Sequence, residues 1–508
     1  MQGVEQERKL WNWEAQPLQS RSIVSRQSIS VRRSRKSKAH DGRAAHDGRR
    51  GAARANGGYA QLEAVIRSGE VDTVITAITD MQGRLMGKRV TGDFFLEHAK
   101  DGTHFCTYLL GTDMEMRTPS GYRLMNWETG YGDWLADPDW STTRVLPWLE
   151  KTAIVLCDAR DEATRELIPV APRTILRQQV ERARAAGYEP LTASELEFYL
   201  LRDSYEGAQA KHFHDLKPFG WYNEDYHLLQ ATKAEPLYRQ FRNQMCAAGV
   251  PVEFSKGEAA PGQHEVNIHY DAALESADRH ALFKHGLKEI AWQNGYAVTF
   301  MAKPDHSWTG SSAHIHVSLR ATKGSKNIFH DAKGSPYGMS QTMRHFLGGL
   351  IAGMRELAFF IAPFVNSYKR FAPGSWAPVH LVWGRDNRTC AFRVVGHGDA
   401  LRIETRLPGG DANPYLAYSA VIGAGLHGIE HGIEPPEEFT GNGYTAVQFP
   451  RVPRALWESV QLLEQSALAR EIFGDDVVDH YLNAARVELD AFDSVVTCWE
   501  RERYLERG

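Results

Sequence analysis

Apolar residues along this chain recur with spacings that change from segment to segment, and each spacing predicts a type of element. Leu62 and Ile66 recur at helical spacing and Gly69 follows them, which favours a short helix from residue 59. Residues 71–78 are apolar or alternate like a strand, and residues 85–90 form a second such run after a turn that contains glycine. The pattern therefore predicts a helix followed by a β-hairpin.

Further along, helical and strand-like patterns alternate without a regular repeat. A helix is expected from Pro172 up to Gly187, and longer helices are expected over residues 277–294 and 341–360. Apolar or alternating runs predict strands at 194–200, 297–303, 313–319 and 401–407. This irregular mixture is typical of an α+β fold.

The first 55 residues have a composition unlike the rest of the chain. They hold 13 Lys/Arg against 5 Asp/Glu and few apolar residues. Such a segment cannot bury enough apolar surface to offset its ordering entropy, so we interpret residues 1–55 as a disordered basic tail. A patch for nucleic acid or an anionic surface is one alternative, and a start codon assigned too far upstream is another. The chain of 508 residues is long enough for two further domains, which we place at 56–165 and 166–508.

Composition excludes several classes of protein. Hydrophobic residues make up 42% and charged residues 24%, which is the balance of an ordinary soluble globular protein. No apolar run approaches the roughly 18 residues that a membrane-spanning helix needs. The five cysteines are far apart and never in C-x-x-C spacing, so neither a disulfide framework nor a zinc site is indicated. We therefore expect a cytoplasmic protein.

Two pairs of glutamates are the first candidates for chemistry. Glu195 and Glu197 share one face of a predicted strand, because side chains alternate with a period of two. This pair alone is commonplace on a solvated strand. Glu258 and Glu265 flank a Pro-Gly turn, which can aim two carboxylates inward from adjacent segments. Four converging glutamates would suit a hard divalent ion such as Mg²⁺ or Mn²⁺.

Two further predicted strands carry polar side chains on one face. His314 and His316 share such a face. A lone histidine is more often a satisfied core or surface residue than a ligand, but two of them beside four acids favour a ligand role and a structural role about equally. Arg402, Glu404 and Arg406 also share a face, where two guanidinium groups could clamp a phosphate, but an exposed salt-bridge strand would look the same. The chain has no glycine-rich nucleotide motif, so a nucleotide would have to be held by metal and arginine.

Taken in order, these segments resemble the glutamine synthetase family over nearly all of residues 60–500. The motifs that carry the resemblance are Glu195-Leu-Glu197, Lys256-Gly-Glu-Ala-Ala-Pro-Gly-Gln-His-Glu265, Phe300-Met-Ala-Lys-Pro304, His314-Ile-His316, Val365-Asn-Ser-Tyr-Lys-Arg-Phe-Ala-Pro-Gly374, Asn387-Arg388, Arg393, Arg402-Ile-Glu-Thr-Arg406 and Asn413-Pro-Tyr-Leu416. The resemblance implies an N-terminal β-grasp domain and a catalytic domain whose antiparallel sheet forms a funnel. It also implies two stacked rings of six subunits, a homododecamer, with active sites between subunits.

The same resemblance implies a role for each candidate residue. One metal ion would be held by Glu197, Glu258 and Glu265, and the other by Glu195, His314 and Glu404. The substrate carboxylate or the transferred phosphoryl group would be contacted by Arg370 and Arg406. The ATP phosphates would be bound by Arg388, Arg393 and Arg402, and the adenosine portion by His316 and Ser318.

The family's reaction is a ligation in two steps. ATP first phosphorylates the γ-carboxylate of glutamate, which is otherwise a poor electrophile, while metals and arginines absorb the charge of the moving phosphoryl group. An amine then displaces phosphate. An alkylamine with a pKa near that of lysine, about 10.4, must lose a proton before it attacks. In the family an aspartate of the neighbouring subunit helps at this step, and Asp113 is the candidate here.

Departures from the family's motifs concern the amine. Where glutamine synthetases have a glutamate that helps to close the ammonium pocket, this chain has Trp376, which favours a site with apolar surface. The loop Thr309-Gly-Ser-Ser312 also departs from the family's pattern. The chain is therefore most similar to glutamine-synthetase-like γ-glutamylamide ligases, such as those that act on polyamines or ethanolamine. An ordinary glutamine synthetase that uses ammonium is the alternative, and a non-catalytic scaffold is a third hypothesis.

Overall fold

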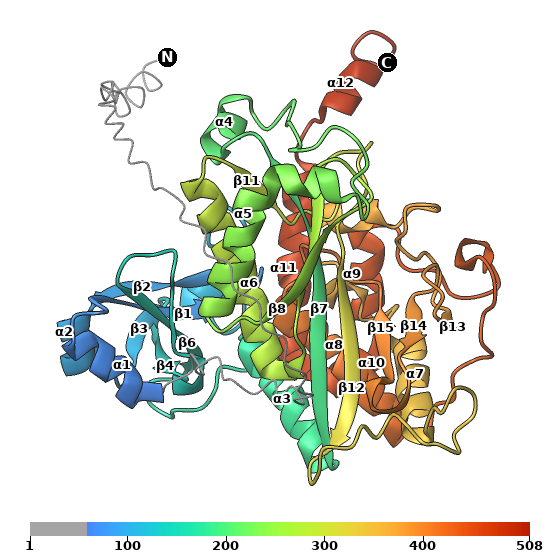
Figure 1. The fold of residues 1–508 in the computed structure, drawn as a ribbon, viewed down its shortest axis with the longest axis horizontal. Helices are drawn as coiled ribbons and strands as arrows, with labels where there is room; N and C mark the ends of the chain where they lie inside the picture. Colours follow the sequence, from blue (N-terminus) through green and yellow to red (C-terminus); the bar gives the residue numbers. More distant parts are fainter. Residues whose placement is uncertain (1–57) are drawn as a thin grey trace, which may run out of the picture. The chain divides into compact units, whose positions relative to one another are not determined.

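A computed structural model describes residues 58–508, so the basic tail expected at residues 1–55 lies outside the described residues. The first sheet contains β1 (Thr73–Thr79), β2 (Leu85–Thr91), β3 (Thr103–Cys106), β4 (Asp133–Pro138), β5 (Arg144–Val145) and β6 (Thr152–Arg160). Helix α1 (Gly58–Arg67) buries Leu62 and Ile66, and β1 pairs antiparallel with β2, which confirms the predicted helix and hairpin. The strand order is β2-β1-β6-β4-β3, with β5 beside β6, and the short helix α2 (Gly92–Phe94) follows β2 (Figure 1).

A nine-stranded sheet forms the centre of the rest of the chain. Its strands are β7 (Tyr188–Leu201), β8 (Val252–Gly257), β9 (Gln263–Ile268), β10 (Asp271–Ala272), β11 (Ala297–Thr299), β12 (Ala313–Ala321), β13 (Trp383–Arg385), β14 (Phe392–Val395) and β15 (Arg402–Thr405). The main order is β13-β14-β15-β12-β7-β9-β8, and the long strands β7 and β12 lie side by side in Figure 1. β11 and β12 both pair with β7, at different stretches of it. The strand β7 therefore connects most of the segments that carry predicted site residues.

Helices cover this sheet and pack on one another. The structure contains α3 (Pro172–Ala185), α4 (Tyr205–Ala210), α5 (Leu228–Ala247), α6 (Ala273–Gln293), α7 (Gln341–Gly353), α8 (Pro414–Glu430), α9 (Leu456–Glu464), α10 (Ala467–Phe473), α11 (Asp475–Asp493) and α12 (Cys498–Tyr504). α3 and α6 contact β7, while α7 packs on α8. A Cβ at Gly349 would lie 2.1 Å from the Ala424 carbonyl oxygen, so glycine permits this close helix contact. α7 ends at Gly353 instead of continuing over the predicted 341–360, and a 3₁₀ turn follows at Ala358–Phe360.

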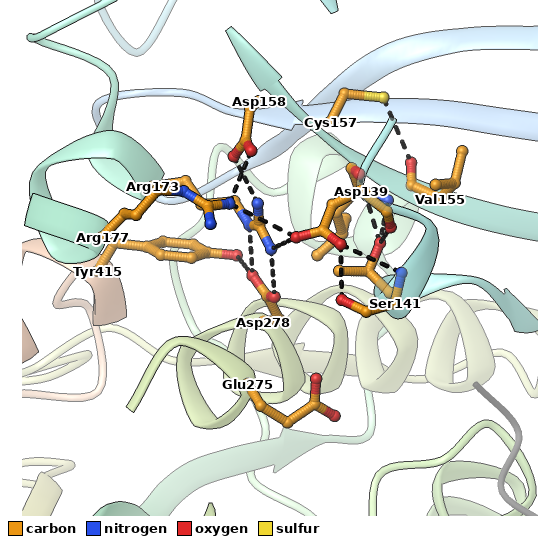
Figure 2. Close-up of polar contacts among 12 residues, drawn as sticks. Asp139, Ser141, Val155, Cys157, Asp158, Arg173, Arg177, Glu275, Asp278 and Tyr415 are labelled. Carbon is orange, nitrogen blue, oxygen red and sulfur yellow. Dashed lines mark hydrogen bonds and ion pairs between the residues drawn. The ribbon is translucent and has the colours of Figure 1, made fainter. Parts of the chain in front are cut away.

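A buried cluster of ion pairs joins the first sheet to the helices of the second (Figure 2). Arg173 on α3 donates to Asp158 on β6 at 2.5 Å and to Asp278 on α6 at 3.0 and 2.9 Å. Asp139, just after β4, accepts from the same guanidinium at 2.8 Å, and the Tyr415 hydroxyl donates to Asp278 at 2.7 Å. Burial disfavours the charge of Asp139, but Arg173 outweighs this effect and lowers the pKa of the carboxyl to about 2. A guanidinium group from a helix of the second sheet is therefore paired with carboxylates from the first sheet's segments as well as from α6.

A second connection lies at the start of α8. The side-chain amide of Asn413 donates to the carbonyl oxygens of Asp80 and Met81 at 3.2 and 3.0 Å. These two carbonyls belong to the turn of the β1–β2 hairpin, whose Asp80 carboxylate is in turn bound by Arg84 at 2.6 Å. The hairpin turn is therefore fixed against the segment that follows β15.

Residues 58–508 contain neither a disulfide nor a helix of the membrane-spanning kind. All five cysteines are free, as their spacing predicts. None of the helices in this part of the chain is long and apolar enough to cross a bilayer.

Candidate active site

A cavity of about 730 Å³ opens beside the central strands of the nine-stranded sheet. Side chains of β7, β8, β9, β12, β13, β14 and β15 contribute to its wall, and the segments around residues 370–377, 386–388 and 396–397 complete it. Most of the residues singled out from the sequence line this cavity. They are Glu195, Glu197, Glu258, Glu265, His314, His316, Arg370, Trp376, Arg388, Arg393, Arg402 and Arg406.

Three of the sequence-predicted residues do not line the cavity. Glu404 is fully buried directly behind the wall, within hydrogen-bonding distance of two arginines that do line it. Ser318 lies further along β12, opposite Leu191 on β7 and outside the cavity wall. Asp113 lines a separate small hollow together with Glu488. The role expected for Asp113 lies in the active site of a neighbouring subunit, so it stays a prediction. The role of Ser318 also stays a prediction.

Glu197, Glu258 and Glu265 form the first acid cluster, in which one carboxylate oxygen of each lies within 4.8 Å of the others. Glu197 on β7 stands directly opposite Glu265 on β9 in the antiparallel register, and Glu258 follows the end of β8. Opposed residues share a sheet face, so the pairing of β7 with β9 brings the carboxylates together. The Ser312 backbone N–H and the Gln263 side-chain amide donate to Glu197 at 2.8 and 3.2 Å and fix its orientation.

This acid cluster carries more negative charge than its neighbours compensate. Burial, followed by repulsion from Glu195 and Glu258, raises the pKa of Glu265 to about 11. Burial and then Glu258 also raise the pKa of Glu197. Lys256 pairs with Glu258, and this is the one ion pair that the cluster makes among residues 58–508. Three carboxylates at this spacing stay ionised when a cation lies between them, so the residues present fit a hard divalent ion.

Glu195, His314 and Glu404 form the second cluster, again with one ligand atom of each within 4.8 Å of the others. His314 Nδ1 lies 3.0 Å from Glu195 Oε1 and 3.6 Å from Glu404 Oε1. Burial disfavours charge on Glu404, but Arg406 and then the nearby histidines outweigh burial and lower its pKa to about 2. Glu404 therefore remains ionised and can act with His314 as a metal ligand.

Arginines form the cationic part of the wall. Arg370 is 3% exposed and donates to two backbone carbonyls just after β15, at 2.8 and 3.0 Å. Burial lowers its pKa to about 10, so its guanidinium keeps its charge at neutral pH. Arg402 Nε donates to His316 Nδ1 at 3.1 Å, and His316 Nε2 lies 3.3 Å from Glu195 Oε2. Because Nδ1 accepts this bond, the proton of His316 is on Nε2, facing Glu195. Such guanidinium groups can bind phosphate oxygens.

Trp376 presents its indole to the cavity with 57% of the residue exposed. Its φ angle is 64°, in the left-handed region where bulky residues are uncommon. The Ser375 hydroxyl donates to the carbonyl of Ala372 at 2.6 Å and stabilises the same turn. An unfavourable backbone conformation of this kind persists only where the surrounding structure holds it, and such conformations are common at functional sites.

Several polar residues of the site received no role from the sequence. Lys256 belongs to one of the motifs that resemble the family. It lies two residues before Glu258, and this spacing could have predicted the ion pair between them. Gln263 gave no such signal, because its amide reaches Glu197 only through the pairing of β9 with β7. Arg385 lines the cavity from β13 and donates to the Gly396 carbonyl at 2.7 Å.

Two clusters of acidic side chains that fit divalent ions face an arginine-rich wall, an arrangement typical of metal-dependent enzymes that transfer phosphoryl groups. Residues 169–504 match the family model described as glutamine synthetase, catalytic domain. The chain belongs to the glutamine synthetase family, and its two sheets are the β-grasp domain and the catalytic sheet that the family resemblance implies. Enzymes of this family depend on ATP and a divalent metal, which agrees with the donor sets in the cavity.

Similar proteins include amine ligases as well as glutamine synthetases. The chain is 49% identical over 451 residues to gamma-glutamylethanolamide synthetase GlnA4 of Streptomyces coelicolor, which covers 89% of this chain and 96% of that protein. It is 37% identical over 447 residues to a glutamate–isopropylamine ligase of Pseudomonas sp., with 87% and 96% covered. A solved structure described as a GmaS/ADP complex superposes with a TM-score of 0.77 at 29% identity and covers 88% of this chain and 99% of that one.

Proposed function

We propose that this protein is an ATP-dependent ligase that joins the γ-carboxylate of glutamate to an organic amine. The observation that carries the proposal is Trp376, whose exposed indole forms part of the cavity wall. By the family resemblance, this position corresponds to a glutamate that helps to close the ammonium pocket. An indole offers a broad apolar face and one N–H donor in place of a negative charge, so it favours a carbon-bearing amine. The similarity to an ethanolamide synthetase and an isopropylamine ligase supports the same choice.

The acid clusters would hold two divalent ions, which we propose to be Mg²⁺ or Mn²⁺ because the ligands are mainly oxygen. Bound ions of this kind neutralise phosphate charge. A γ-carboxylate oxygen of glutamate attacks the γ-phosphorus of ATP, ADP leaves, and γ-glutamyl phosphate forms. Arg370 and Arg406 line the cavity and would stabilise the charge that develops on the transferred group. The other phosphates are assigned to Arg388, Arg393 and Arg402, and the adenosine portion to His316 and Ser318.

The amine then attacks the carbonyl carbon of γ-glutamyl phosphate, loses a proton and expels phosphate. We propose that Asp113 of a neighbouring subunit accepts this proton, because Asp113 lies outside the cavity of its own chain. This assignment requires a homo-oligomer, for which the family's dodecamer of two hexameric rings is the proposed form. The five free cysteines support a cytoplasmic location for the enzyme.

The test is a measurement of phosphate release with ATP, glutamate, Mg²⁺ and a panel of amines. The panel contains ethanolamine, isopropylamine, methylamine, a polyamine and ammonium. We expect kcat/KM for one organic amine to exceed that for ammonium by about 100-fold, which is about 2.7 kcal/mol in transition-state binding. If ammonium is the best substrate, the protein is an ordinary glutamine synthetase instead. If no amine supports phosphate release, the scaffold hypothesis replaces both.

A further inference from the structure

A third group of metal-binding side chains lies at the C-terminal end of α8, and none of its members lines the cavity. His427 and His431 are one helical turn apart, and Glu471 comes from α10, which contacts α8. One nitrogen of each imidazole and one carboxylate oxygen of Glu471 all lie within 4.8 Å of one another. Two histidines and a carboxylate in this arrangement are a common donor set for transition metals.

The two imidazoles use Nδ1 in different ways. His431 Nδ1 lies 3.0 Å from the His427 carbonyl oxygen, and because a carbonyl only accepts, Nδ1 carries the proton. His427 Nδ1 lies 2.8 Å from Glu471 Oε1, so this nitrogen and the carboxylate face each other, and an ion bound between them would replace the proton that they share. The two ring centroids are 4.1 Å apart. His431 therefore keeps an Nε2 lone pair, and the His427 carbonyl orients its ring as the outer partners of metal ligands do.

The electrostatic surroundings favour a cation at this position. His431 caps the C-terminal end of α8, where the last carbonyl groups carry partial negative charge. Arg182 pairs with Glu430, next to His431 in the chain, and Arg470, next to Glu471, pairs with Asp475 and Asp479. Among residues 58–508, the one ion pair of Glu471 is with His427. The carboxylate is therefore available to a bound ion.

We propose that His427, His431 and Glu471 form a transition-metal site that binds Zn²⁺ or an ion of similar preference. Imidazole nitrogen selects such ions over Mg²⁺, whereas the glutamates of the cavity select Mg²⁺ or Mn²⁺. His427 is half-buried, while His431 and Glu471 are exposed, so water completes the coordination. The bound ion links α8 to α10 and takes no part in the reaction that joins glutamate to the amine.

The test measures zinc binding by the full-length protein. Chelator-treated protein is kept in a large excess of Mg²⁺, which occupies the oxygen-rich clusters, and Zn²⁺ is titrated by calorimetry while bound zinc is counted per chain. We expect wild type to bind one more zinc per chain than His431→Ala. The matched control is His345→Ala. His345 lies on α7 and contacts the Glu434 carboxylate at 3.1 Å, but it belongs to no three-ligand group in the described chain.

Thermal melting gives a second readout that does not depend on activity. Zinc should raise the melting temperature of wild type and of His345→Ala, and leave that of His431→Ala unchanged, because a ligand stabilises only a folded state that binds it. If His431→Ala does not fold, Glu471→Gln is used in its place, since it keeps the shape of the side chain and loses the charge, and it should weaken zinc binding at least tenfold. Equal zinc stoichiometry in wild type and in the folded variant overturns the proposal.

Discussion

The carboxylate of Glu404 accepts a hydrogen bond from Arg406, two residues later along the chain, at 2.5 Å. Arg393 donates to the other carboxylate oxygen at 2.8 Å. Both arginines line the cavity, while Glu404 lies behind its wall beside His314. One buried carboxylate therefore orients two guanidinium groups and still has lone pairs for a metal ion.

This arrangement predicts that the acid clusters are required for turnover but not for folding. Glu258→Ala and Glu404→Ala should each lower kcat by about 100-fold or more, because each removes a charged metal ligand. Glu128→Ala is the control, because Glu128 is exposed and lies outside the cavity. Rates are measured against Mg²⁺ concentration at saturating ATP. Full turnover in both cluster variants would contradict the assigned metal sites.

The second prediction concerns the choice of amine. Trp376→Glu should restore a negative charge to the cavity wall and reduce the preference for an organic amine over ammonium from about 100-fold to about 10-fold. Trp376→Phe should keep the preference, because it retains an apolar aromatic face. Values of kcat/KM for both amines at saturating ATP and glutamate decide the matter. If the ratio of kcat/KM for the organic amine to kcat/KM for ammonium is unchanged in Trp376→Glu, the indole does not determine the choice of amine.

The third prediction concerns the pH dependence of stability. Lys284 on α6 donates to the Gly410 and Ala412 carbonyls at 2.8 and 3.2 Å, and burial, followed by repulsion from Lys288, lowers its pKa to about 7. In the unfolded chain the lysine pKa is about 10.4, so between pH 7 and pH 10 the unfolded state binds the extra proton. Stability contributed by this group therefore rises with pH in that window, by up to about 1.4 kcal/mol per pH unit.

Urea unfolding of wild type and Lys284→Met at pH 7, 8 and 9 checks this sign. The free energy of unfolding of wild type, minus that of Lys284→Met, should increase as the pH rises. Lys284→Met removes the titrating group and keeps a long side chain at a half-buried position. Parallel pH profiles for the two proteins would show that Lys284 titrates alike in the folded and unfolded states.

The fourth prediction concerns the ion-pair cluster of Figure 2. Arg173→Met should lower the free energy of unfolding by about 3–5 kcal/mol, because it leaves three carboxylates without their shared buried cation. Arg177→Met should lower the free energy of unfolding much less, since the Arg177 side chain is 24% exposed where it pairs with Asp158 and Asp139. Urea midpoints of both variants are compared at neutral pH. Equal losses would mean that burial of the guanidinium does not decide the effect.

Local patterns in the sequence were sufficient for some parts of the site. A period of two placed Glu195 and Glu197 on one face of β7, and the Pro-Gly turn placed Glu258 and Glu265 on adjacent segments. The sequence pattern could not specify that β9 pairs with β7 in a register that opposes Glu265 to Glu197. Such pairing joins residues far apart in the chain and leaves no periodic signal.

Other features depend on several separate elements at once. The partners of Arg173 come from β6, the segment after β4 and α6, so no spacing along the chain predicts the cluster. The family resemblance singled out Trp376 by its identity, whereas its positive φ follows from the fold of the loop around it. The zinc-binding group proposed here combines a local signal, histidines four residues apart, with a carboxylate that only the packing of α10 supplies.

The ion pairs of Arg173 also limit how the two sheets can be recombined between relatives. Asp158 lies on β6 of the first sheet and Asp139 just after its strand β4, whereas Arg173 and Asp278 belong to the helices of the second sheet. A chimera that receives its first sheet from another family member inherits whatever residues stand at the two acid positions. A neutral residue at either position leaves the buried guanidinium with fewer partners. We therefore expect such chimeras to fail at the junction between their parental halves, even when every residue of the cavity is retained.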